Sequence, residues 1–228
     1  MMYNIKMRLT YILLLVSSLA FSESRVKVAI VDTGLRSDPY LMSFICKVQP
    51  VDVTNTGIYD NYGHGTNITG TVLQGLDPNK VCFIPIKFFN GPEDKGSVWL
   101  DALRAVKRLN VSYLNASLSG TGSIPGESEL ILGLLNDGVR IAVAAGNDGQ
   151  NLDLNCNIFP GCLRIASPFF RVVGHTFKGI PVKTSNYGKV VTDWSEGYSS
   201  YGGIVMNGTS QATALLMNKW LKLKYKKK

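Results

Sequence analysis

The chain has 228 residues, of which 45% are hydrophobic, and this size and composition predict one domain with a sizeable core. Its formal net charge of +8 resembles that of a nucleic-acid-binding protein, but the excess is confined to the two ends of the sequence. Lys6 and Arg8 carry part of it, and the rest comes from the lysines at positions 219, 222, 224 and 226–228. Because the body of the chain is neutral, we expect no nucleic-acid partner.

Residues 1–22 have the pattern of a secretory signal peptide. Lys6 and Arg8 precede an apolar run at 9–20, and Ala20 and Ser22 are small residues of the kind that a signal peptidase reads. A membrane anchor is the alternative, but the run has about 12 residues and a span needs about 20. We therefore expect cleavage after Ser22 and a mature chain that is secreted or periplasmic.

Four cysteines, an even number in a chain with export features, predict disulfide bonds. Three pairings are open. The compact loop between Cys156 and Cys162 can close on itself and leave Cys46 with Cys82, and this is the pairing that we prefer. The sequence has no Cys-x-x-Cys and only two histidines, so we expect no metal site of the zinc type.

Predicted strands and helices alternate from Val26 onward. The β-branched run at 26–32 is typical of a buried strand that ends in a carboxylate. Further strands are predicted at 81–88, 111–118 and 139–145, and helices at 97–109 and 127–137. This alternation predicts a three-layer α/β fold, with a mostly parallel sheet and helices on both of its faces.

Four polar residues stand beside glycines, at predicted strand ends or helix starts. Asp32 ends the first strand, where ligand sites form in open α/β sheets, or it caps the next turn. His64 lies between two glycines, which would give a substrate clearance to approach. Asn147 is either a turn residue or an amide donor to a developing oxyanion. Ser210 is either the N-cap of an apolar helix or a nucleophile.

These segments resemble the motifs of the subtilisin-like serine proteases. Residues 32–34 (Asp-Thr-Gly) are similar to the aspartate motif of that family, residues 63–66 (Gly-His-Gly-Thr) to its histidine motif, and residues 208–210 (Gly-Thr-Ser) to its serine motif. They occur in the order known for subtilisin. Residues 145–147 resemble the oxyanion-hole segment, and residues 115–120 resemble the edge strand that pairs with a bound peptide.

The resemblance implies a secreted serine endopeptidase that acts on peptides or proteins. It implies a catalytic triad of Asp32, His64 and Ser210, with Asn147 in the oxyanion hole. The implied substrate-binding residues are Ser117, Leu118, Ser119, Gly120, Ala145 and Gly146. We expect a peptidase domain at 23–223, a basic tail at 224–228, a monomer and no cofactor.

Several departures from the family pattern leave alternatives open. The sequence leaves no room for the usual prodomain between Ser22 and the first strand, and the loops that hold calcium in many relatives look missing, so a calcium requirement stays open. The alternative function is a catalytically silent pseudoprotease that binds peptides or a partner protein in the same groove. The basic tail would allow a weak contact with an anionic envelope in either case.

Overall fold

The computed structural model describes residues 25–91 and 96–226, so the predicted signal peptide lies outside the described residues. The main sheet contains the strands β1 (Val26–Asp32), β2 (Val51–Asp52), β3 (Val81–Lys87), β4 (Tyr113–Ala116), β6 (Arg140–Ala144), β8 (Phe170–Phe177), β9 (Ile180–Pro181) and β10 (Asp193–Glu196). Its order is β10-β8-β6-β4-β1-β3-β2, with parallel pairs throughout, and β9 pairs antiparallel with β8. This topology confirms the predicted α/β class.

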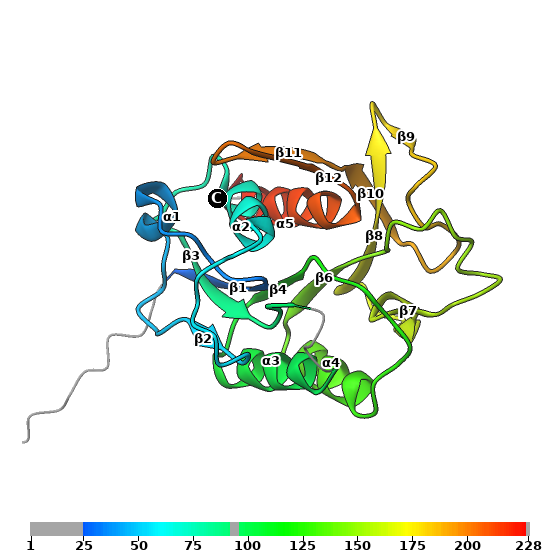
Figure 1. The fold of residues 1–228 in the computed structure, drawn as a ribbon, viewed down its shortest axis with the longest axis horizontal. Helices are drawn as coiled ribbons and strands as arrows, with labels where there is room; N and C mark the ends of the chain where they lie inside the picture. Colours follow the sequence, from blue (N-terminus) through cyan, green and yellow to red (C-terminus); the bar gives the residue numbers. More distant parts are fainter. Residues whose placement is uncertain (1–24, 92–95, 227–228) are drawn as a thin grey trace, which may run out of the picture.

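Helices cover both faces of the sheet and complete the three layers (Figure 1). Helices α3 (Gly96–Arg108) and α4 (Glu127–Asn136) lie on one face, and α2 (His64–Leu73) and α5 (Thr209–Lys226) lie on the other. The remaining elements are α1 (Pro39–Ser43), the paired strands β5 (Gly120–Thr121) and β7 (Ile158–Phe159), the 3₁₀ turn Gly161–Leu163, and the hairpin of β11 (Tyr198–Tyr201) and β12 (Ile204–Asn207). Because α5 continues to Lys226, residues 224–226 of the predicted tail are helical.

Each face of the sheet carries its own hydrophobic core. In β1, Val28 and Ile30 pack with residues of α2 and α5, whereas Ala29 and Val31 pack with residues of α3 and α4. Side chains of a strand alternate between faces, so the consecutive apolar residues at 28–31 are what a strand buried on both faces requires. The burial of β1 fixes where its last residue, Asp32, is placed: at the carboxyl edge of the sheet.

Two disulfides link the cysteines in the pairing preferred from the sequence. Cys46 bonds to Cys82 across a separation of 36 residues, and Cys156 bonds to Cys162 across a separation of 6. The first bond joins the loop after α1 to β3, and both of its cysteines are buried. No helix within the described residues is long and apolar enough to cross a membrane.

We expect the two disulfides to differ in their contribution to stability. Closing a longer loop removes more conformational entropy from the unfolded chain, so Cys46→Ala with Cys82→Ala should lower the free energy of unfolding by roughly 3–4 kcal/mol. The matched pair Cys156→Ala with Cys162→Ala should cost about 2 kcal/mol. Urea unfolding of both double variants measures the difference. An equal or larger loss for the short loop would contradict the entropic explanation.

Candidate active site

Three residues predicted from separate segments line one cavity at the carboxyl edge of the sheet. Asp32 is the last residue of β1, His64 is the first residue of α2 and Ser210 is the second residue of α5. The cavity has a volume of about 380 Å³, and its other walls are Thr33, Tyr62, Phe88, Phe89, Ser117, Leu118 and Ser119. The fold thus brings together residues that are up to 178 positions apart in the sequence.

Asp32 and His64 form a short hydrogen-bonded pair. Nδ1 of His64 lies 2.6 Å from Oδ1 of Asp32, and the same oxygen accepts the backbone N–H of Thr33 at 2.8 Å. The side chain of Asp32 is 4% exposed and that of His64 is 28% exposed. Burial disfavours the imidazolium, but the charge and hydrogen bond of Asp32 outweigh it, so the pKa of His64 is raised above 6.5.

The glycines beside His64 serve the packing of the protein itself. Gly63 has a φ of +79°, and a Cβ there would lie 2.7 Å from Cδ1 of Ile204. A Cβ on Gly65 would lie 2.4 Å from the backbone oxygen of Gly34. The start of α2 therefore contacts the turn after β1 at backbone distance. Close approach to the turn after β1 explains Gly65, and the left-handed φ and the contact with Ile204 explain Gly63.

Asp60 is a second buried carboxylate behind the site, although its position before α2 indicates only a turn residue. It is 0% exposed. Its Oδ1 accepts bonds from Thr33 and from the backbone of Tyr62 and Gly63, and its Oδ2 accepts the N–H and the hydroxyl of Thr66, all within 3.0 Å. Burial raises the pKa of Asp60, but these donors outweigh it and the pKa is lowered.

Ser210 and Ser117 exchange two hydrogen bonds. The Ser210 hydroxyl donates to the backbone oxygen of Ser117 at 2.9 Å, and the Ser117 hydroxyl donates to the backbone oxygen of Ser210 at 2.8 Å. Asn115 donates its side-chain N–H to the Ser117 hydroxyl at 2.9 Å. The Ser210 hydroxyl thus bonds to the end of the β4 segment in this structure, in a cavity that His64 also lines.

Asn147 lies next to the start of α5. Its Oδ1 accepts the backbone N–H of Thr209 at 2.9 Å, and the hydroxyl of Thr209 accepts the N–H of Gly146 at 3.1 Å. A Cβ on Gly208 would lie 3.1 Å from Oδ1 of Asn147, so glycine leaves room for this contact. Two hydrogen bonds therefore join the turn after β6 to the start of α5.

Asn186 holds the Asn147 turn in place, and no sequence pattern singled it out. This side chain is 0% exposed. Its Oδ1 accepts the backbone N–H groups of Asp148 and Gln150, and its Nδ2 donates to the backbone oxygen of Ala145 at 2.9 Å. One buried amide thereby satisfies three backbone groups of the loop, and that loop carries Asn147.

The residues implied in substrate binding divide into two groups. Ser117, Leu118 and Ser119 line the cavity, and Gly120 belongs to β5, which pairs with β7. Ala145 and Gly146 are buried, and Ala145 packs into the core on the α3 and α4 face. The first group borders the space beside Ser210. The second group does not line this cavity.

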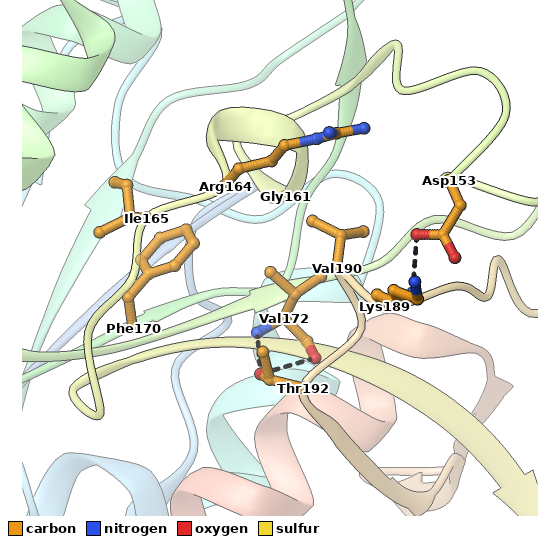
Figure 2. Close-up of a pocket in the computed structure, with 9 residues that line it drawn as sticks. All are labelled: Asp153, Gly161, Arg164, Ile165, Phe170, Val172, Lys189, Val190 and Thr192. Atoms are coloured by element: carbon orange, nitrogen blue, oxygen red, sulfur yellow. Dashed lines mark hydrogen bonds between the residues drawn. The ribbon is translucent and has the colours of Figure 1, made fainter.

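A separate cavity lies away from these residues, between the loops after β7 and before β10 (Figure 2). Its volume is about 290 Å³, and Phe170, Val172 and Val190 form apolar walls. Asp153 accepts the backbone N–H of Lys189 at 2.8 Å at its rim. The described ranges 25–91 and 96–226 contain no cluster of three or more metal-ligating side chains.

A sequence model of the subtilase family matches residues 23–224. The chain belongs to the subtilase family. Subtilisin-like protease 11 of Arthroderma gypseum is 28% identical over 179 residues, which cover 72% of this chain and 42% of that protein. The major intracellular serine protease of Bacillus subtilis is 28% identical over 140 residues, covering 55% of this chain and 44% of that protein. This subtilase chain thus matches less than half the length of these curated relatives.

Solved structures support the same fold. A cold-adapted subtilisin-like serine proteinase superposes with a TM-score of 0.72 at 23% identity, covering 91% of this chain and 78% of that one. A lanthipeptide protease superposes with a TM-score of 0.73 at 18% identity, covering 87% and 73% of the two chains. At these identities the similarity establishes that this subtilase has the subtilisin-like fold.

The two histidines should titrate on opposite sides of pH 6.5. The pKa of His64 is raised by Asp32, whereas burial lowers the pKa of His175 more than Glu196 raises it. In Asp32→Asn the burial of His64 remains without the charge, so its pKa should fall below 6.5 while that of His175 stays unchanged. NMR titration of both imidazoles tests this. A raised pKa that persists in the variant would mean that Asp32 is not the cause.

Asp60→Asn should destabilise the protein by about 2–4 kcal/mol at pH 7, because an amide NH₂ would face buried donors in place of an acceptor. A carboxylate whose folded pKa is lowered stabilises the protein above its unfolded pKa, near 3.8, and loses that effect as the pH falls through the folded value. The difference between wild type and variant should therefore shrink in acid.

Urea unfolding at pH 7 and pH 3 measures the effect of Asp60→Asn. Asp101→Asn is the control, since Asp101 is exposed and forms a surface ion pair with Arg104. That change should alter the free energy of unfolding by less than about 1 kcal/mol. Equal losses in the two variants would show that the Asp60 network contributes no more than a surface contact.

Proposed function

We propose that the chain is a serine endopeptidase that hydrolyses peptide bonds through Asp32, His64 and Ser210. The observation that carries the proposal is the 2.6 Å contact between Asp32 and His64 in a cavity that Ser210 also lines. Membership of the subtilase family supports it. The proposed substrates are extended peptides or proteins, bound beside residues 117–120 by a monomer that needs no cofactor.

The proposed mechanism needs a base because a serine hydroxyl is too weakly acidic to attack an amide unaided. With Nδ1 of His64 held by Asp32, Nε2 takes the proton from Oγ of Ser210 as the hydroxyl attacks the carbonyl carbon, and then returns it to the leaving amine. Only neutral His64 can accept this proton. Activity should therefore rise as the pH increases through the raised pKa of His64.

The negative charge that forms on the carbonyl oxygen needs donors. Because Oδ1 of Asn147 is occupied by the N–H of Thr209, its Nδ2 remains to donate to the oxyanion. The N–H of Ser210, in the first turn of α5, is the second donor of the proposal. In subtilisin, removing the asparagine donor lowers kcat about 10²–10³-fold, and this magnitude is carried over from that protein.

A second candidate function is peptide binding without hydrolysis. It is favoured by the hydrogen bond from the Ser210 hydroxyl to the backbone oxygen of Ser117, because this bond directs the hydroxyl to an acceptor other than the imidazole. Catalytic hydrogen bonds are often long or misaligned in unliganded enzymes and tighten only when substrate binds. The retention of all four polar groups makes the endopeptidase the better supported function.

Export of the mature chain is part of the proposal. The signal-like pattern at 1–22 and the two disulfides support an oxidising compartment outside the cytoplasm. The Bacillus subtilis relative is named an intracellular protease, so family membership alone does not decide the compartment. A weak contact with an anionic envelope is proposed for the lysine-rich end of α5, where Lys219 and Lys224 are exposed.

A fluorophosphonate should form one covalent adduct with the purified mature chain, because this reagent modifies a serine that a neighbouring base activates. Intact mass spectrometry should detect one adduct on the wild type and none on Ser210→Ala. Peptide mapping should place it on Ser210, and not on Ser117 or Ser119. A folded, oxidised chain that forms no adduct would favour the peptide-binding function and contradict the proposed hydrolysis.

A further inference from the structure

The cavity shown in Figure 2 has an apolar interior and lies apart from the candidate active site. No described residue lines both this cavity and the one that contains Ser210. Its interior is formed by Ile165, Phe170, Val172 and Val190, and of these Phe170 and Val172 are each 2% exposed. Water takes about 30 Å³ per molecule, so a cavity of about 290 Å³ holds on the order of ten non-hydrogen atoms. The space is therefore large enough for a small organic ligand.

The polar groups inside this cavity are already hydrogen-bonded. The hydroxyl of Thr192 accepts the N–H of Val172 at 3.0 Å and donates to the carbonyl oxygen of the same residue at 3.3 Å (Figure 2). Among the 9 described residues that line the cavity, none has a buried side-chain nitrogen or oxygen without a partner. A polar group placed there would lose its bonds to water and gain none from the protein. The interior therefore favours the apolar body of a ligand.

The mouth of the cavity carries two cations and one carboxylate. Arg164 and Lys189 line the cavity and are exposed. Over the part of the chain that the structure describes, neither of them forms an ion pair. The carboxylate of Asp153 accepts the backbone N–H of Lys189 at 2.8 Å, and Figure 2 shows Arg164 extending toward the same side, away from Ile165 and Phe170. One positive charge is left in excess, so the mouth is complementary to an anion.

The charged mouth and the apolar interior together define the class of ligand. A guanidinium presents a planar fork that bonds to a carboxylate through two N–H groups, and such charged hydrogen bonds are about twice as strong as neutral ones. An inorganic anion would leave the apolar walls uncovered. An alcohol would not use the two cations, and an amine would be repelled by them. An anion with an apolar chain uses both parts of the cavity.

We propose that this cavity binds an acyl carboxylate of medium chain length. The chain packs against Phe170, Val172 and Val190, and the carboxylate is held by Arg164 and Lys189. This proposal does not depend on peptide hydrolysis at Ser210.

A bound carboxylate would contact two parts of the fold at once. Gly161 in the cavity wall belongs to the loop that the bond between Cys156 and Cys162 closes, whereas Phe170 and Val172 belong to β8. Because a ligand that binds only the folded state stabilises it, the ligand should also raise the Tm of the protein.

Isothermal titration calorimetry with octanoate, octanol and octylamine tests the selection, because the three compounds share one chain and differ in the charge of the head group. Each is used below the concentration at which it aggregates. Octanoate should bind about tenfold more tightly than octanol, and octylamine should bind more weakly still. Each buried methylene contributes about fourfold in affinity, so butyrate should bind on the order of 10²-fold more weakly than octanoate.

Three variants place the bound carboxylate in this cavity. Arg164→Gln with Lys189→Gln should lower the affinity for octanoate about tenfold and leave that for octanol unchanged. Arg104→Gln with Lys178→Gln is the matched control, since it removes two exposed cations that do not line the cavity and should not alter octanoate binding. Val190→Trp fills the interior and should abolish the binding of octanoate and octanol alike.

Several outcomes would overturn the proposal. It is wrong if octanoate does not bind, or if octanol or octylamine binds as tightly as octanoate. Equal losses in the two charge variants would mean that net charge, and not this mouth, attracts the ligand. Binding that survives in Val190→Trp would place the ligand elsewhere. Should the variant of Arg164 and Lys189 fail to fold, Lys189→Gln alone must still lower the affinity for octanoate several-fold.

Discussion

The site depends on supplying hydrogen-bond donors to two buried carboxylates, Asp32 and Asp60, where water hardly reaches them. A buried carboxylate is costly unless hydrogen bonds and charges compensate for its lost hydration. Thr33 links the two: its N–H donates to Asp32, its hydroxyl donates to Asp60, and the same hydroxyl accepts the N–H of Gly65. The donors that stabilise both carboxylates belong to the segments that place His64. The same hydrogen bonds therefore stabilise the two buried carboxylates and position the imidazole of His64.

Because β1 is buried on both of its faces, much of this fold could be predicted from the sequence. The four consecutive apolar residues at 28–31 predict a strand covered on both faces, and the alternation of strands and helices then predicts a parallel sheet. Asp32, His64 and Ser210 stand at predicted strand ends or helix starts, and their grouping in one site was implied by the resemblance to the subtilisin-like serine proteases. The predicted ends of the elements were less accurate. The strand predicted at 111–118 is β4, Tyr113–Ala116, and the side chain of Ser117, just after its end, donates to the backbone oxygen of Ser210.

Contacts between residues that are distant in the sequence could not be predicted from it. Asp60 has the neighbours of an ordinary turn residue, and only its five donors, which come from two separate segments, distinguish it. Asn186 stabilises a loop nearly 40 positions earlier. Glu127 is an acid of the first turn of α4, which helices favour for local reasons, and the sequence does not show that it is buried and accepts the indole N–H of Trp99 in α3. In each case the decisive quantity is the loss of solvent, which tertiary packing alone produces.

The reciprocal bonds between Ser117 and Ser210 bear on how the proposed nucleophile could move. The bond from the Ser117 hydroxyl to the backbone oxygen of Ser210 involves no side-chain atom of Ser210, so it persists if the Ser210 hydroxyl rotates toward His64. In the proposed mechanism the Ser210 hydroxyl leaves the carbonyl acceptor for the imidazole, while the bond from the Ser117 hydroxyl still joins the β4 segment to α5. A peptide that pairs beside Ser117 would act on the same segment that holds the hydroxyl. Substrate binding and alignment of the nucleophile would then be coupled through a single residue.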